Sequence, residues 1–156
     1  MTSSKLALLG SLAVLLLTYP AAAAEPFGEW LVAGKTARIR VVDCVDTLWG
    51  VVSWEKDRGG VDEKNPDAAK RARPTLGMPI MLRMRKVKDG WDGSIYNSSN
   101  GKTYTGGVRM NKNGSLHIFG CVLMVLCGGE DWTRTEPAEG GLEATADAIC
   151  EALREF

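Results

Sequence analysis

The sequence predicts an all-β fold, a small antiparallel up-and-down barrel with an added C-terminal α-helix. Three observations support this prediction. About eight or nine short runs rich in β-branched and aromatic residues follow one another along the chain. Asn-Gly dipeptides at Asn100 and Asn113 mark tight hairpin turns between some of these runs. Near the C-terminus, this pattern gives way to apolar residues at helical spacing.

The N-terminal residues predict an export signal. Lys5 precedes the short apolar run Leu6 to Leu17, and the small residues Ala21 to Ala24 follow a proline. A basic residue, an apolar run and small residues in this order are typical of a secretory signal peptide. The run is shorter than the roughly 20 apolar residues of a membrane helix. We therefore expect cleavage after Ala24 and a periplasmic or secreted domain over residues 25–156. The alternative is an uncleaved anchor or a buried helix.

The strands are predicted by alternation of apolar and polar residues, which places every second side chain on the same face of a sheet. In Pro79 to Val87, for example, this places Ile80, Leu82 and Met84 on the inner face. The predicted strands are Glu29–Ala33, Thr36–Val42, Leu48–Glu55, Pro79–Val87, Gly90–Asn97, Lys102–Met110, Gly114–Phe119, Val122–Leu126 and Asp131–Thr135.

Closure of these strands into a barrel follows from their edges. An open meander has two edges with unpaired backbone groups, and closing the sheet removes both. The alternative, a two-layer sandwich, needs long crossover connections. Only the segment Lys56 to Gly77 is long enough to make one, so the sequence favours the barrel.

The segment Lys56 to Gly77 is polar and rich in glycine, proline and charge, and loops of this length are often functional. Residues 67–73 are expected to form one helical turn. Two interpretations of its charges are open. Arg71 and Arg73 bind an anionic head group at the barrel mouth, since a guanidinium suits carboxylate or phosphate. Alternatively, Asp62 pairs with an arginine and pins the loop.

The C-terminal region predicts an amphipathic helix. After a Gly-Gly break, the apolar residues Leu142, Ala146, Ile149 and Leu153 recur at helical spacing. We therefore expect a helix over Leu142 to Arg154, packed on the outside of the barrel.

Four cysteines, at positions 44, 121, 127 and 150, indicate disulfides in an exported chain. Four cysteines allow three pairings, and the sequence does not decide between them. We favour Cys121 with Cys127 and Cys44 with Cys150, of which the second would attach the helix to the barrel. No C-x-x-C is present and His117 is the only histidine, so no metal site is predicted.

Charge and motifs argue against several classes of function. The chain has 19 basic and 19 acidic residues, and loss of Lys5 with the leader leaves 18 against 19, a net charge of −1. Nucleic-acid binding needs a basic excess or stripe, so nucleic acid is not an expected partner. His117 alternates with Leu116 and Ile118, which indicates an outward-facing structural residue. We expect neither an enzyme nor a cofactor.

Motifs along the chain resemble known families. Gly28-Glu29-Trp30 resembles the opening motif of lipocalins, and this resemblance implies that Trp30 packs at the closed end of a barrel. It also implies that Arg134, after Trp132, lies against Trp30. A longer series is similar to a family of exported bacterial proteins known only as a domain of unknown function, the 2147 family, and implies a lipocalin-like (calycin-like) barrel. The series comprises Gly28-Glu29-Trp30, Asp62 to Pro66, Arg71 to Pro74, Gly77, Trp91, Gly101 to Tyr104 and Trp132 to Arg134.

The expected function is binding without chemistry. The interior of an eight-stranded barrel holds either packed side chains or one small ligand. Met84, Met110 and Met124 are candidate ligand contacts because methionine adapts to irregular surfaces, although each is also a suitable core residue. We therefore predict a partner that is a small hydrophobic or amphipathic molecule. The alternative is an envelope module that docks an unknown protein through the 56–77 loop or the C-terminal helix.

Overall fold

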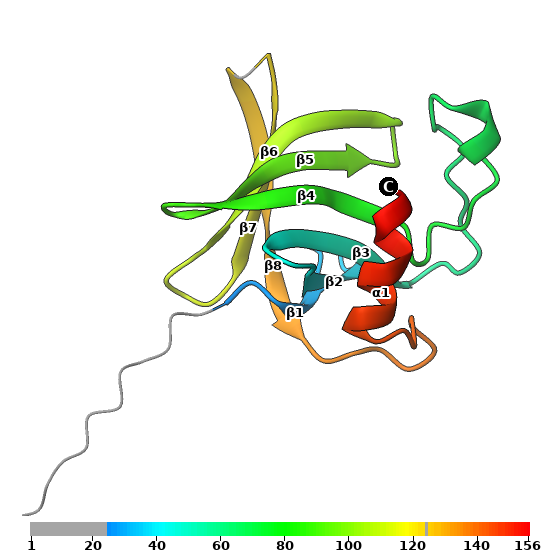
Figure 1. The fold of residues 1–156 in the computed structure, drawn as a ribbon, viewed down its shortest axis with the longest axis horizontal. Helices are drawn as coiled ribbons and strands as arrows, with labels where there is room; N and C mark the ends of the chain where they lie inside the picture. The colour runs from blue at the N-terminus through cyan, green and yellow to red at the C-terminus, as the bar shows by residue number, and fades with distance from the viewer. Residues whose placement is uncertain (1–24, 124) are drawn as a thin grey trace, which may run out of the picture.

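The chain forms a closed barrel of eight antiparallel strands, in which each strand pairs with the next and β8 pairs with β1 (Figure 1). The structure is a computed structural model that describes residues 25–123 and 125–156. The predicted leader and Met124 lie outside the described residues. The barrel prediction is confirmed. The strands are β1 (Gly28–Leu31), β2 (Ala37–Asp43), β3 (Thr47–Glu55), β4 (Pro79–Val87), β5 (Gly90–Asn97), β6 (Lys102–Met110), β7 (Leu116–Val122) and β8 (Leu126–Thr135).

One predicted strand is wrong. The apolar run from Val122 to Leu126 contains the turn between β7 and β8 instead of a strand of its own. Cys121 and Cys127 face each other across these two strands and form a disulfide. Alternation cannot reveal this turn, because apolar residues occupy both strand ends and the turn between them. The last strand is therefore a single long element that runs to Thr135.

The C-terminal helix is shorter than predicted. Helix α1 spans Ala146–Ala152 and continues as the 3-10 turn η2 (Leu153–Glu155), on the outside of the barrel (Figure 1). The helix begins after Thr145 because the Thr145 hydroxyl accepts a hydrogen bond from the backbone N–H of Ala148, at 3.2 Å. Leu142 precedes the helix, and its N–H donates to the Ser53 carbonyl at 2.7 Å.

The barrel encloses an inner core of large apolar side chains. Trp30, Leu48, Met81 and Met84 are completely buried. Fully burying such a side chain stabilises the fold by roughly 1.5–3 kcal/mol. The inner core consists of Trp30, Ile39, Val41, Leu48, Val52, Met81, Met84, Trp91, Val108, Leu116, Ile118 and Trp132.

Strand β4 departs from strict alternation. Met81 and Met84 both belong to the inner core, whereas Leu82, which we expected on the inner face, packs in an outer cluster. The pairing of β4 with β5 shifts between Leu82 and Arg85, and Arg83 has a φ of 48°. A β-bulge of this kind inserts one residue and reverses the face of those beyond it.

The outer cluster joins the helix to the barrel. Ile149 and Leu153 pack against Val42, Trp49 and Val51 on the outer surface of β2 and β3. The Cys44–Cys150 disulfide attaches the helix to the end of β2, as predicted. Ile149 and Leu153 are therefore the two side chains of this segment that are buried against the barrel.

Candidate functional site

One end of the barrel is filled by a stacked pair of side chains. β1 and β8 pair so that Trp30 lies opposite Arg134, whose guanidinium carbon is 4.3 Å from the centroid of the indole. Arg134 Nη1 donates to the Phe27 carbonyl at 2.7 Å. Gly28 has a φ of 113°, and a Cβ there would lie 3.1 Å from Arg134 Nη1. The three residues thus close the base as a unit, and a guanidinium over an indole stabilises it by roughly 0.5–2 kcal/mol.

An open cavity of about 820 Å³ lies in the other half of the barrel and extends to its rim, where exposed residues such as Asp57 and Leu126 line it. This volume lies within the range of small-molecule sites, roughly 300–1,000 Å³. The strand turns on this side are the β1–β2 turn, the 56–77 loop, and the β5–β6 and β7–β8 turns (Figure 1). The aliphatic side chains that line the cavity include Val32, Ile39, Val52, Ile80, Ile95 and Ile118.

Glycines line part of this space. Gly120 of β7 and Gly128 of β8 face each other in register and both line the cavity. They follow the alternation of the core residues Leu116, Ile118 and Trp132, so side chains at these positions would point inward. A Cβ on Gly128 would meet no atom within 4 Å. The space in front of Gly128 is therefore open, whereas the Tyr104 side chain covers Gly120, where a Cβ would lie 3.1 Å from the Tyr104 Cβ.

The barrel wall is also incomplete beside the cavity. β8 pairs with β1 only from Thr133 to Thr135, because β1 ends at Leu31. From Leu126 to Trp132, β8 pairs only with β7 among the described residues. The β1–β2 turn, with Val32 and Thr36, lines the cavity there.

The cavity combines apolar walls with acidic groups. Its charged lining residues within the described part of the chain are Glu55, Asp57 and Glu130, and all are acidic. The Glu130 carboxylate accepts a hydrogen bond from the Trp132 indole N–H. Thr75 also lines the cavity, and its buried hydroxyl has no hydrogen-bond partner among the described residues.

An exposed apolar tip forms part of the rim. Leu123, Val125 and Leu126 are 84%, 76% and 71% exposed, at the turn held by the Cys121–Cys127 disulfide. Val122 and Leu126 also line the cavity. The rim at this hairpin therefore presents apolar surface to solvent.

The methionines selected from the sequence lie elsewhere. Met84 is completely buried in the inner core and does not line the large cavity. Met110 lines a smaller hollow of about 220 Å³ together with Trp91 and Leu116. Met124 lies outside the described residues. The lining of the large cavity consists mainly of β-branched side chains and glycines, which give no recognisable sequence signal.

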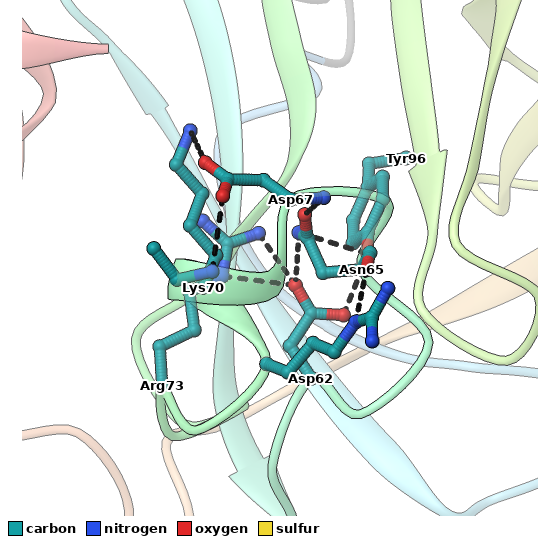
Figure 2. A network of polar contacts seen from close by, with 8 residues as sticks. Asp62, Asn65, Asp67, Lys70, Arg73 and Tyr96 are labelled. Atoms are coloured by element: carbon teal, nitrogen blue, oxygen red, sulfur yellow. Dashed lines mark hydrogen bonds and ion pairs between the residues drawn. The ribbon is translucent and has the colours of Figure 1, made fainter.

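The 56–77 loop is pinned by a buried carboxylate (Figure 2). Asp62 is completely buried and accepts hydrogen bonds from Tyr96 Oη at 2.6 Å and Asn65 Nδ2 at 2.7 Å. Arg73 donates to the same carboxylate through Nε at 2.9 Å and approaches it through Nη2 at 2.8 Å. Arg71 Nε donates to the Asn65 carbonyl at 2.8 Å. Both arginines thus hold the loop, and neither lines the cavity.

The charge state of this network follows from its hydrogen bonds. Burial by itself raises the pKa of Asp62, but hydrogen bonds from Tyr96, Asn65 and Arg73 and the charge of Arg73 outweigh it and hold the pKa below its usual value. Burial, and then the adjacent Asp62, raise the pKa of Tyr96. An ionised Asp62 therefore accepts from a neutral phenol. The sequence motif around Asp62 indicated a pairing of this carboxylate with an arginine. Nothing in the sequence indicated that Tyr96 belongs to the same network.

His117 lies outside the cavity. It is 39% exposed, and its Nδ1 lies 2.7 Å from Asp131 Oδ1 on the outer surface of β7 and β8. The hydrogen bond with His117 lowers the pKa of Asp131. Residues 25–123 and 125–156 contain no cluster of three or more potential metal ligands. In the same residues, none of the helices has the length and apolar character needed to cross a membrane.

Comparisons with known proteins agree with this architecture. A solved structure described as "Protein HP1028 from the human pathogen Helicobacter pylori belongs to the lipocalin family" is similar to the chain with a TM-score of 0.72 at 19% sequence identity. The similarity covers 84% of this chain and 99% of that one. No curated protein sequence matches the chain. The model of a family described as "Uncharacterized protein conserved in bacteria (DUF2147)" matches residues 28–134, and the chain therefore belongs to that bacterial family.

Proposed function

We propose that this protein is an exported, lipocalin-like binding protein that holds one small hydrophobic or amphipathic molecule in its barrel. The observation that carries the proposal is the cavity of about 820 Å³, with its isoleucine and valine walls. Each methylene group that moves from water into such a cavity stabilises the complex by about 0.8 kcal/mol. Gly128 of β8 supports the proposal, because the space in front of it is not filled by the protein itself.

Export is supported by the cysteines. Two disulfides, Cys44–Cys150 and Cys121–Cys127, join all four cysteines, and such bonds persist in oxidising compartments. Together with the leader in the sequence, they favour a periplasmic or secreted protein that is cleaved after Ala24.

We propose that the protein binds its ligand without catalysis. The histidine pairs with Asp131 on the outer surface, and the buried Asp62 is fully engaged in holding the loop. Neither group lines the cavity in which a ligand is expected to lie.

Native mass spectrometry on gently purified protein tests ligand binding. We expect wild-type protein to carry a co-purified small molecule, or to take up the neutral apolar dye N-phenyl-1-naphthylamine. Gly128→Leu places a side chain in open cavity space and is expected to abolish both signals. The matched control is Thr133→Leu, on the exposed side of the same strand, which is expected to retain them. Wild-type protein that shows neither a bound mass nor dye uptake contradicts the proposal.

Docking of a protein partner through the loop or the helix is the competing hypothesis. It has less support, because Ile149 and Leu153 are buried against the barrel and the arginines of the loop hold its own backbone and Asp62. Pull-down experiments with and without residues 56–77 separate the two hypotheses, since specific capture that depends on this loop favours docking.

A further inference from the structure

We propose that the ligand carries a cationic group, such as an ammonium, that lies against Glu130 while its apolar part fills the cavity. This inference rests on the proposed binding function and specifies the chemical class of the ligand. It is carried by the signs of the charges in the cavity, by the surroundings of Glu130, and by one unpaired buried hydroxyl.

The charge of the cavity selects against anions. Glu55, Asp57 and Glu130 line it, and the described lining contains no lysine, arginine or histidine. Arg73, which holds the adjacent loop, is bound to Asp62 and does not line the cavity. An anionic head group would therefore leave water for a site that offers it acidic neighbours, whereas a cation finds compensating charge.

Glu130 lies on the cavity side of β8 beside the Trp132 indole, at a position that is exposed to solvent. It pairs in register with Ile118, one inward position below the open space at Gly128. Its Oε1 accepts from the Trp132 indole, and its Oε2 has no hydrogen-bond partner among the described residues. Tyr104 also lines the cavity and lies close to the glycine pair, since a Cβ on Gly120 would be 3.1 Å from the Tyr104 Cβ. A carboxylate on the wall of an apolar cavity suits an ammonium group, which is attracted by its charge.

A second polar group in the cavity lacks a partner. Thr75 is 8% exposed, and its hydroxyl oxygen makes no hydrogen bond within the described part of the protein. This oxygen and Glu55 Oε1 lie 2.6 and 3.5 Å from the point that a Cβ on Gly60 would occupy, so the two groups converge at the rim. Buried polar groups are usually satisfied, and an unpaired one that lines a cavity indicates a missing polar partner. A hydrogen-bonding group on the part of the ligand near Glu55 would supply it.

Three amphiphiles with the same chain and different head groups test the inference. Dodecyltrimethylammonium, dodecyl maltoside and dodecyl sulfate are titrated below their micellar concentrations, and displacement of N-phenyl-1-naphthylamine reports binding. We expect the cationic probe to bind at least about fivefold more tightly than the neutral one, with the anionic probe the weakest.

Variants assign the preference to Glu130. Glu130→Gln keeps an acceptor for the Trp132 indole and removes the charge, so it is expected to weaken the cationic probe about fivefold and leave the neutral probe unchanged. Glu143→Gln removes an equal charge from an exposed position outside the cavity and is the matched control.

The possible outcomes distinguish the two proposals. Equal binding of all three probes, or an unchanged preference in Glu130→Gln, overturns the inference and leaves the binding function intact. Absence of binding by any probe, together with absence of dye uptake, overturns both.

Discussion

The base and the mouth of the barrel are built from the same eight strands but are filled differently. At the base, the inward positions carry Trp30, Leu48, Met84 and Leu116, all completely buried. Toward the mouth, the inward positions of β7 and β8 carry glycines, and β8 continues beyond the end of β1. Small side chains and the incomplete pairing of β8 with β1 therefore distinguish an open half from a packed half.

This difference indicates that the base serves mainly to stabilise the fold and the mouth mainly to provide space for a ligand. The base contributes apolar burial and the Trp30–Arg134 stack, on which stability depends. The mouth buries less apolar surface than the base and instead contains the cavity with its acidic residues. Substitutions at the base should thus lower stability, whereas substitutions on the cavity wall should change binding while the fold remains.

The largest effect is expected at the base. Trp30→Ala removes a completely buried indole and leaves Arg134 without its aromatic partner. The free energy of unfolding should fall by about 3–5 kcal/mol, as measured by denaturant titration. Trp54→Ala, at a partly exposed position of β3, is the control and should cost less. Equal losses of unfolding free energy in both variants would contradict the proposed role of the base in stability.

The loop beside the mouth is the exception to this contrast, because a buried network holds it. Asp62→Ala leaves Arg73, Asn65 and Tyr96 without their shared acceptor. We expect a loss of about 2–3 kcal/mol, since Arg73 is partly exposed and water compensates some of its lost pairing. Limited proteolysis should show faster cleavage within residues 56–77. An unchanged cleavage rate would show that the loop does not depend on this carboxylate.

Asp62 also predicts a dependence of stability on pH. Its pKa in the folded protein lies below the unfolded value of about 3.9. Its contribution is therefore fully present above that value and is lost as pH falls toward the lower folded pKa. Unfolding free energies measured between neutral pH and about pH 3 should decline less steeply in Asp62→Asn than in wild type. Parallel curves would contradict this assignment.

The smallest effect on stability is expected at the cavity wall. Gly128→Leu introduces a side chain into open space, so its free energy of unfolding should stay within about 0.5 kcal/mol of wild type while dye uptake is lost. Thermal unfolding and dye titration on the same sample measure both quantities. A large loss of stability would mean that the upper wall is as tightly packed as the base.

The base of the barrel could be predicted from the sequence better than the mouth. Alternation identified most strands, and the Gly28-Glu29-Trp30 and Trp132-Thr133-Arg134 motifs pointed to residues that the fold brings together. The β4 bulge at Arg83 was not predicted, because one inserted residue cannot be recognised in an alternating pattern.

The candidate site could be predicted only in outline. An eight-stranded barrel implies an interior, but the methionines selected as ligand contacts do not line the cavity. Part of its space lies in front of Gly128, and an absent side chain gives no chemical signal. The inward direction of Glu130 depends on the register of β8, which in turn depends on recognising the β7–β8 turn.

The Cys44–Cys150 disulfide closes most of the described chain into a covalent ring. It joins positions 106 residues apart, so strands β3 to β8 and the 56–77 loop lie inside one covalent ring. A single backbone cut anywhere in that ring opens it without releasing a fragment. A nicked molecule should therefore keep its full mass on a non-reducing gel and separate into two pieces only after reduction.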